Sequence, residues 1–307
     1  MIRRFISIIA VSLVFVLTTV AETARAYTLQ GKTVLVTGSS GGIGKGIAKL
    51  LAEERGAKII VHYNNREEEA RNFGNELGSD RCLGVLHCDF RDISSIPSFF
   101  RKAQNLCVDS QKIDVLINNA GAITKSALDS DDDLLKVWRD TMAVNLDAPN
   151  LLGKLFAEQF ERNDGESRID DNDDSCADDE TTKGVILNVG SIHGDRSNEY
   201  MGAYAASKAA LESLTRTMAI EYASRGIRAN LIAPGIVPVE RTEKFFEKFP
   251  ETLKGWTDKI PVKRAGNVKQ VAQACLPLIE NEWITGAVWQ IDGGMMARAN
   301  MPERTRP

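Results

Sequence analysis

Histidine and cysteine are scarce in this sequence. Three histidines and five cysteines are spread over 307 residues, with no CxxC pair and no grouping at metal-ligand spacing. We therefore predict no metal site. The cysteines are too dispersed to indicate a disulfide framework, and reduced, buried thiols are the more typical state of such residues. They are Cys82, Cys88, Cys107, Cys176 and Cys275.

An excess of positive charge is also absent. Lysine and arginine number 38 against 42 acidic residues, for a formal net charge of −4. This balance gives no reason to expect nucleic acid as a partner. With 43% hydrophobic and 26% charged residues, the composition is that of an ordinary globular protein with enough apolar material for a large core.

The amino terminus differs from the rest of the chain. Arg3 and Arg4 precede an uncharged run over 5–21, and a small-x-small triplet at 24–26 resembles a signal-peptidase site that leaves Tyr27 first. We predict a signal peptide over residues 1–26. An uncleaved membrane anchor is the alternative, because the run is close to the lower limit of about 17 residues for a spanning helix.

A signal peptide predicts entry into the secretory pathway and an endomembrane lumen. The unpaired cysteines and the absence of an N-x-S/T sequon fit that compartment poorly. A plastid reached through the endoplasmic reticulum is a second hypothesis that removes this conflict. We expect membrane association only if the run over 5–21 remains uncleaved.

Beyond residue 26, short β-rich runs alternate with helical periodicity. This pattern predicts βαβ units, right-handed crossovers and a parallel sheet covered on both faces. We predict an α/β fold with one doubly wound, Rossmann-like domain over 27–307. The first five expected strands lie at 33–36, 58–62, 83–87, 115–117 and 185–189, and a late strand lies at 288–291. Helical spacing is clear at 44–55 and 93–106.

One acidic segment, at about 163–183, interrupts this alternation. Between Asp164 and Glu180 it holds nine acidic residues and one basic residue, Arg168, without apolar periodicity. Such a segment buries too little apolar surface to offset the entropy of ordering, so we predict a disordered, solvated insertion. An interaction or cation-binding segment is the alternative.

The first expected strand leads into a glycine-rich turn, TGSSGGIG at 37–44, followed by a helix. Glycines at this position let the backbone approach a pyrophosphate, and they direct the amino terminus of the helix at it. The spacing is TGxxxGxG rather than GxGxxG. Glycine turns also occur for purely steric reasons, so this motif needs support from others.

Tyr204 and Lys208 supply a separate chemical argument. They are four residues apart and so share one face of a helix. A tyrosine pKa of ~10 is poorly suited to acid/base work at neutral pH, and a neighbouring ammonium lowers it by stabilising the phenolate. Ser191 would polarise a substrate oxygen through a hydrogen bond. An ordinary amphipathic pair on a surface helix is the alternative.

Further motifs follow the turn in a fixed order. They are Asp89 after the third strand, NNAG at 118–121, Asn145 in AVNL, Ser191 in NVGS, YAASK at 204–208 and Pro234-Gly235 after the sixth strand. Together they resemble the single-domain branch of the short-chain dehydrogenase/reductase family from about Lys32 to Met296. The carboxyl-terminal ITGAVWQIDGGM is similar to 3-oxoacyl-acyl-carrier-protein reductases and glucose 1-dehydrogenases.

The resemblance implies an NAD(P)-dependent oxidoreductase that interconverts a carbonyl and a secondary alcohol, and a homo-oligomer. The implied catalytic residues are Asn145, Ser191, Tyr204 and Lys208, with Asn145 carrying a proton-relay water and Lys208 also holding the nicotinamide ribose. The implied cofactor-binding residues are Gly38, Ser40, Gly42, Ile43, Gly44, Tyr63, Asn64, Arg66, Asp89, Asn118, Ala120, Gly121, Tyr204, Lys208, Pro234 and Gly235.

The end of the second strand bears on the choice of cofactor. NAD-binding enzymes usually place an acid there for the ribose hydroxyls, whereas this chain has Tyr63 and Asn64, with Arg66 before the first acid, Glu67. We therefore predict a preference for NADP(H), with NAD(H) as the alternative. Gly41 opposes this prediction, because many NADP-preferring relatives carry a basic residue at that position.

The substrate is not readable from the sequence. The family builds its pocket from the segment at 236–256, where Phe245, Phe246, Phe249 and Trp256 alternate with charges, as in an amphipathic lid or in ordinary packing. We expect a small-molecule or acyl-chain carbonyl or alcohol, with a 3-oxoacyl thioester as a candidate. A non-catalytic NADPH sensor or scaffold is the alternative function.

Overall fold

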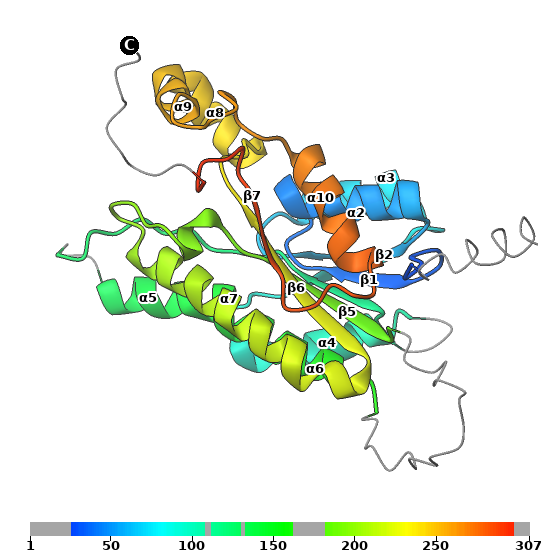
Figure 1. The fold of residues 1–307 in the computed structure, drawn as a ribbon. Helices are drawn as coiled ribbons and strands as arrows, with labels where there is room; N and C mark the ends of the chain where they lie inside the picture. Colours follow the sequence, from blue (N-terminus) through cyan, green and yellow to red (C-terminus); the bar gives the residue numbers. More distant parts are fainter. Residues whose placement is uncertain (1–25, 108–111, 130–132, 162–181, 298–307) are drawn as a thin grey trace, which may run out of the picture.

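A computed structural model describes residues 26–107, 112–129, 133–161 and 182–297. Strands and helices alternate along most of this chain (Figure 1). The strands are β1 (Thr33–Val36), β2 (Lys58–Tyr63), β3 (Cys82–His87), β4 (Val115–Asn118), β5 (Gly184–Val189), β6 (Ile227–Pro234) and β7 (Val288–Ile291). The α-helices are α2 (Gly42–Arg55), α3 (Glu67–Leu77), α4 (Ile96–Gln104), α5 (Leu134–Met142), α6 (Ala148–Ala157), α7 (Gly202–Glu221), α8 (Glu240–Lys248), α9 (Pro250–Thr257) and α10 (Val268–Glu280).

The strands form a parallel sheet in the order β3-β2-β1-β4-β5-β6-β7. The chain runs outward from β1 to β3 and then returns to β4 on the other side of β1. This reversal is the topological switch point, where open α/β sheets bind ligands at the carboxyl ends of the strands. The predicted doubly wound, Rossmann-like fold is therefore confirmed.

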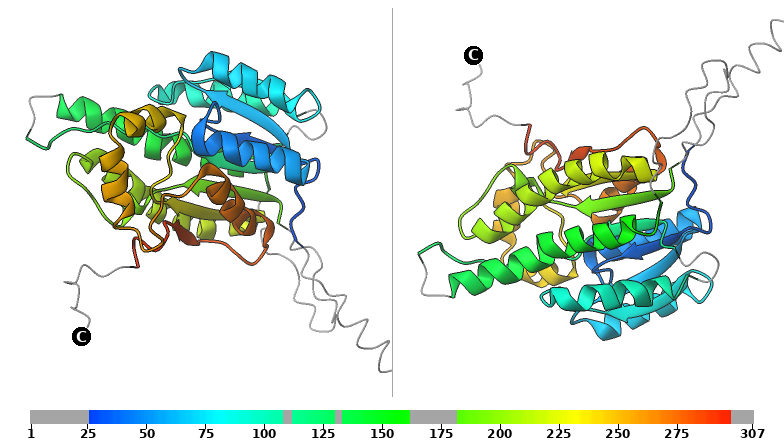
Figure 2. Two further views of the ribbon diagram at one scale, coloured as in Figure 1. Left: turned by 90° about the horizontal axis from the view of Figure 1, so that it is seen from above. Right: turned by 90° about the horizontal axis from the view of Figure 1, so that it is seen from below.

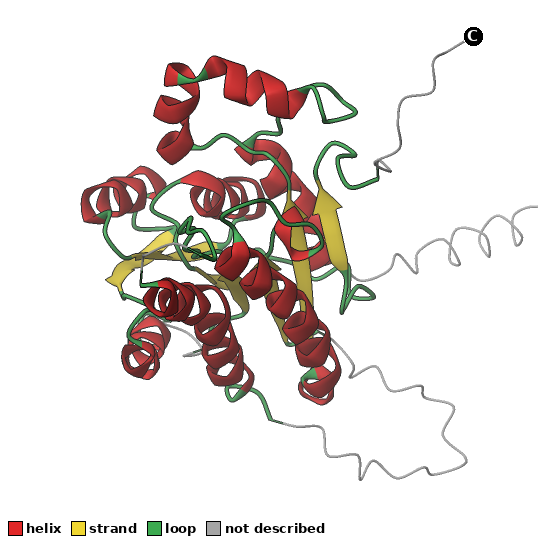
Figure 3. Ribbon diagram, turned by 90° about the vertical axis from the view of Figure 1, so that its left-hand side faces the viewer, coloured by secondary structure: helices red, strands yellow, loops and turns green. Residues whose placement is uncertain are grey.

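Helices cover both faces of the sheet, as the side view shows (Figure 3). The view from above has α2 and α10 in front of the sheet, and the view from below has α4, α6 and α7 in front (Figure 2). Ile47, Phe73 and Val271 belong to the core on the first face, and Phe100 and Phe156 to the core on the second. Each such buried side chain stabilises the fold by about 1.5–3 kcal/mol, so the core fixes the sheet that carries the site.

The predicted elements match the observed ones with small shifts at their ends. The helix expected at 44–55 begins at Gly42, inside the glycine-rich turn. The helical run expected at 93–106 divides into a 3-10 turn, Ile93–Ser95, and α4, because Asp92 caps the turn and Pro97 starts the helix proper. Pro234 is the last residue of β6, where the sequence placed it after the strand.

Several predictions fall outside the described residues. These are the signal peptide or anchor up to residue 25, Cys176 and almost all of the acidic insertion. In the described ranges, no helix is long and apolar enough to span a membrane. Tyr27 is buried, and its amide donates to the Glu280 carbonyl at 2.9 Å, so the packed core includes the residue that the predicted cleavage would leave first.

Candidate active site

The glycine-rich turn joins β1 to α2 at the switch point of the sheet. Gly38 and Gly42 have positive φ angles of 64° and 57°, which glycine adopts without strain. A Cβ at Gly44 would lie 2.3 Å from Asn119 Nδ2, and one at Gly38 would lie 2.9 Å from the Ala120 Cα. The glycines therefore allow the backbone conformation of the turn, and they also allow the NNAG segment to pack closely against it.

Asn119 holds the turn in place. Its Nδ2 donates to the carbonyls of Thr37 at 2.9 Å and Gly38 at 3.1 Å, and its amide donates to Thr37 Oγ1 at 2.9 Å. Asn118 instead donates to Asn188 Oδ1 at 2.8 Å, across β4 and β5. Of these two asparagines of the NNAG motif, only Asn118 is among the predicted cofactor-binding residues. Side chains alternate across a strand, so a strand-end pair places one asparagine on each face.

His62 is a second residue that the sequence analysis did not identify. It is buried at the end of β2, where its Nδ1 accepts from the Gly38 amide at 2.9 Å and its Nε2 donates to the Cys88 carbonyl at 3.0 Å. Burial lowers the pKa of His62 to about 4. The neutral imidazole therefore links the first three strand ends and supports the glycine-rich turn. A lone histidine in a β-rich run gives no such signal.

The turn and the first turn of α2 fit a dinucleotide phosphate. The turn contains no side chain larger than isoleucine, and the residues of the first helical turn include no acid. Amides at a helix amino terminus attract an anion through their N–H groups and the helix dipole. Ser40, Gly42 and Ile43, which we predicted to bind the cofactor, lie on this segment.

The end of β2 places a cation beside the turn. Tyr63 ends the strand and Arg66 caps α3. A Cβ at Gly41 would lie 2.8 Å from Nη2 and 2.9 Å from Nη1 of Arg66, so the guanidinium lies directly on this glycine. Gly41, which opposed an NADP preference in the sequence analysis, thus leaves room for a basic group from another element. Asn64 precedes this cation in the same loop.

Asp89 follows β3 and is held by Arg91. Arg91 Nε donates to both carboxylate oxygens at 3.0 Å, and the Arg91 amide donates to Oδ1 at 3.0 Å. Hydrogen bonding to Arg91 keeps the pKa of Asp89 below its ordinary value. The carboxylate is therefore ionised and fixed in orientation after the carboxyl end of β3.

Ser191, Tyr204 and Lys208 come together on the other side of the switch point. Ser191 follows β5 and is 7% exposed, while Tyr204 and Lys208 lie in the first turns of α7 and are 8% and 3% exposed. Lys208 Nζ lies 5.8 Å from the centre of the Tyr204 ring and donates to the Val189 carbonyl at 2.8 Å. Burial lowers the pKa of Lys208 to about 8. Lys208 thus lies beside Tyr204, and His193 links Ser191 to the same place, because its amide donates to Ser191 Oγ and its ring packs against that of Tyr204.

Asn145 joins this group from a short π-helical segment, Ala143–Asp147, between α5 and α6. Its Oδ1 accepts from the Ala122 amide at 2.8 Å, and its Nδ2 donates to the Ala122 carbonyl and to Ser207 Oγ, both at 3.0 Å. Ser207 Oγ in turn donates to the Tyr204 carbonyl at 2.7 Å. The buried amide therefore ties the loop after β4 to α7. Short π-helical segments of this kind are frequent at functional sites.

His193 lies beside Tyr204, with the two rings edge to face and their centres 5.9 Å apart. Its amide donates to Ser191 Oγ at 3.2 Å, and its Nδ1 donates to the Arg196 carbonyl at 3.1 Å. Burial lowers the pKa of His193. The ring is therefore fixed next to the predicted catalytic residues and is neutral at pH 7.

Pro234 and Gly235 connect β6 to the segment expected to form the substrate pocket. The Gly235 amide donates to the Ile291 carbonyl at 2.9 Å, and a Cβ at Gly235 would lie 2.9 Å from the Asp292 Cα. The glycine therefore allows close contact with the end of β7. These residues place the chain that follows near the carboxyl ends of the central strands.

The segment at 236–256 forms α8 and α9, which lie beyond α10 at one end of the molecule (Figure 1). Phe246 contacts Phe245 and Trp256, with ring centres 5.6 Å apart in each pair, and Phe245 contacts Phe249 at 5.1 Å. Phe245 and Phe249 are each 45% exposed. These aromatic residues thus pack on one another and outside the two cores, as in the lid alternative.

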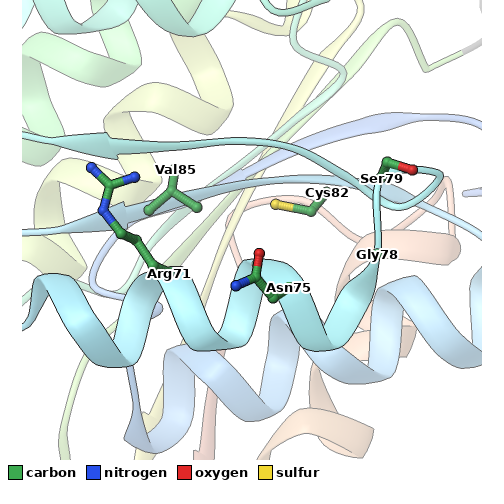
Figure 4. Close-up of a pocket in the computed structure, with 7 residues that line it drawn as sticks. Arg71, Asn75, Gly78, Ser79, Cys82 and Val85 are labelled. Atoms are coloured by element: carbon green, nitrogen blue, oxygen red, sulfur yellow. The ribbon is translucent and has the colours of Figure 1, made fainter.

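A separate surface hollow of about 450 Å³ lies between α3 and β3. Figure 4 shows Arg71 and Asn75 on the helix facing Val85 and Cys82 on the strand. Burial raises the pKa of the Cys82 thiol. Because β3 is the edge strand farthest from β5 and α7, this hollow is distinct from the Tyr204 site.

Comparison with known proteins shows to which family this chain belongs. Residues 32–249 match the model of the family described as short chain dehydrogenase. This chain belongs to the short-chain dehydrogenase family. A 3-oxoacyl-[acyl-carrier-protein] reductase from Rickettsia felis is 32% identical over 273 residues, covering 87% of this chain and 98% of the relative.

Other relatives of this short-chain dehydrogenase are named for different substrates. A galactitol 2-dehydrogenase (L-tagatose-forming) from Cereibacter sphaeroides is 31% identical over 87% of this chain and 96% of its own length. The crystal structure of an acetoin dehydrogenase from Enterobacter cloacae, 28% identical, matches with a TM-score of 0.71 over 90% of this chain and 99% of that one. The short-chain dehydrogenase described here is therefore an NAD(P)-dependent carbonyl/alcohol oxidoreductase.

Proposed function

We propose that this short-chain dehydrogenase uses Tyr204 as its proton donor and acceptor, and that it prefers NADP(H). The observation that supports the first part is the buried pair of Tyr204 and Lys208 at the sheet's switch point, with Ser191 linked to Tyr204 through His193. The observation that supports the second is the guanidinium of Arg66 lying on Gly41.

In the proposed reaction, a substrate carbonyl oxygen lies between the hydroxyls of Ser191 and Tyr204. A nicotinamide bound there would supply the hydride for reduction and would accept it in the reverse direction. Tyr204 gives its proton to the oxygen as negative charge develops there, and Ser191 stabilises that charge through a hydrogen bond. Lys208 stabilises the resulting phenolate when it carries its proton.

Asn145 is a positioning residue in this scheme. Its side chain is committed to Ala122 and Ser207, so it holds the β4 loop and α7 at a fixed separation. A Cβ added at Gly121 would lie 3.6 Å from Asn145 Oδ1 and 3.9 Å from Lys208 Nζ. The absence of a side chain at Gly121 thus leaves space beside the lysine, where the nicotinamide ribose would bind.

The test of the acid/base role is the variant Tyr204→Phe. We expect turnover to fall by at least about a thousandfold, since general acid–base catalysis contributes 10²–10⁴-fold and the oxygen also loses a donor. NADPH affinity should stay within about twofold, because the phenol group acts on the substrate oxygen. Oxidation of NADPH at 340 nm measures the first quantity, and fluorescence titration measures the second.

Tyr222→Phe is the matched control. Tyr222 ends the same helix, about 27 Å from Tyr204 at 1.5 Å per residue, and its loss should leave turnover unchanged. Near-native turnover in Tyr204→Phe would refute the assignment. Tight NADPH binding by the wild type, without turnover of any carbonyl tested, would favour the sensor alternative.

The cofactor preference is tested by comparing kcat/KM for NADPH and NADH. We expect Arg66→Ala to reduce kcat/KM for NADPH by about 10- to 100-fold, the value of a charge-assisted contact to phosphate, and to leave the NADH value almost unchanged. Arg101→Ala, on the exposed face of α4, is the control. A tenfold preference of the wild type for NADH would contradict the proposal.

For the substrate, we propose a carbonyl panel that includes 3-oxoacyl thioesters, polyol-derived ketoses and acetoin. The relatives named above support each of these classes equally. The aromatic residues of α8 and α9 favour an apolar substrate portion. A kcat/KM for acetoacetyl thioesters at least tenfold above that of the ketoses would support the 3-oxoacyl reductase, and the reverse ratio would reject it.

The amino-terminal sequence supports a proposal for the cellular location of the enzyme. We propose that residues 1–26 direct the enzyme into the endomembrane system, with a plastid as the alternative destination. Fluorescent fusions with and without residues 1–26 test this, and equal distribution of the two fusions would contradict it.

A further inference from the structure

A carboxylate from the carboxyl-terminal half of the chain lies at the glycine-rich turn. The amide of Gly42, the first residue of α2, donates to Glu240 Oε2 at 2.8 Å. The two residues are 198 positions apart in the sequence. Glu240 is the first residue of α8, so this contact joins the aromatic helix pair to the cofactor crevice.

The Val239 side chain makes the same approach. A Cβ at Gly42 would lie 3.4 Å from Val239 Cγ1 and 3.9 Å from Glu240 Oε2. The amino terminus of α8 thus lies in van der Waals range of the turn. Thr242 and Val239 form the local cap of α8, with the Val239 amide donating to Thr242 Oγ1 at 3.0 Å. The first turn of α8 is therefore capped without the Glu240 carboxylate, which is left to contact the glycine-rich turn.

A carboxylate and a phosphate satisfy a helix amino terminus in the same way. Both present anionic oxygens to backbone N–H groups at the positive end of the helix dipole. The first turn of α2 has no acidic residue of its own. Glu240 supplies the negative charge at a position where a dinucleotide phosphate oxygen would accept the same hydrogen bond.

We propose that Glu240 is a latch, which holds α8 against the glycine-rich turn in the cofactor-free enzyme and is displaced by the cofactor phosphate. This inference rests on the proposed function, in which the turn binds the dinucleotide. Because α8 carries Phe245 and Phe246, displacement of the latch frees the aromatic lid as the cofactor enters. Cofactor binding thereby prepares the substrate pocket.

The test is the variant Glu240→Gln in the full chain, which removes the charge and keeps the shape. We expect the Kd for NADPH, measured by fluorescence titration, to fall by about two- to fivefold, the effect of one carboxylate at an exposed helix amino terminus. Glu243→Gln is the matched control. Glu243 is an exposed acid one turn further along α8, so it reports the general attraction of a less negative surface for an anionic cofactor.

Hydrogen exchange of the cofactor-free proteins gives a second readout. Amides over 240–248 should exchange faster in Glu240→Gln than in Glu243→Gln, because the latch is lost while the Thr242 cap remains. Equal Kd values for the two variants, or equal exchange, would overturn the latch. If the wild type and both variants all failed to bind NADPH, the proposed function would be wrong, and the latch proposal, which rests on it, would also be wrong.

Discussion

Lys208→Met is expected to make the enzyme more stable and inactive. Lys208 is 3% exposed, and burial lowers its pKa from 10.5 to about 8. At ~1.36 kcal/mol per pKa unit, this difference of 2.5 corresponds to about 3 kcal/mol of unfavourable free energy for the charged form. Methionine has a similar length and no charge, so the variant removes this cost.

The substitution also has an unfavourable component. The Val189 carbonyl loses the donor at 2.8 Å, which costs about 1 kcal/mol. The net stabilisation at pH 7 is therefore about 2 kcal/mol. For a domain of this size that corresponds to a rise in Tm of about 4–8 °C.

The pH dependence gives the sharper test. Between pH 8 and pH 10.5 the unfolded chain binds more protons at Lys208 than the folded chain, so the wild type gains stability as the pH rises through this window. The advantage of Lys208→Met should be complete below pH 8 and disappear towards pH 10.5. Urea unfolding at pH 7 and pH 10 measures it.

Lys269→Met is the control, because Lys269 is exposed on α10 and its loss should change stability little at either pH. A Lys208→Met variant that is less stable than the wild type at pH 7, or whose advantage is the same at both pH values, would refute the reasoning. So would a variant that retains turnover.

Two further predictions concern the glycine-rich turn. His62, with its pKa lowered by burial to about 4, binds fewer protons than in the unfolded chain between pH 4 and pH 6.5, so stability is lost as the pH falls through this window. His62→Gln should lose less stability between pH 7 and pH 4.5 in urea unfolding; an equal loss would contradict the assignment. Gly44→Ala places a Cβ 2.3 Å from Asn119 Nδ2 and should lower stability by about 1–3 kcal/mol and weaken NADPH binding. Gly255→Ala, which meets nothing within 4 Å in α9, should instead raise stability, and equal effects of the two substitutions would disprove the steric argument.

Local sequence patterns determined most of the fold. Branched apolar runs predicted strands such as β1 and β5, because burial on both faces of a parallel sheet requires such runs. The spacing of Tyr204 and Lys208 predicted their common helix face, because 3.6 residues per turn places the fourth neighbour on the same side. These properties depend on a few adjacent residues, so they can be read without the tertiary structure.

The tertiary structure decided which distant groups meet at the turn. Arg66 lies on Gly41, His62 accepts from Gly38, and Glu240 reaches Gly42 from 198 residues away. Asn145, in the π-helical segment between α5 and α6, likewise contacts Ala122 and Ser207 from distant parts of the sequence. Such contacts are set by how the helices pack on the sheet, and packing is a property of the whole core that no short segment of sequence contains.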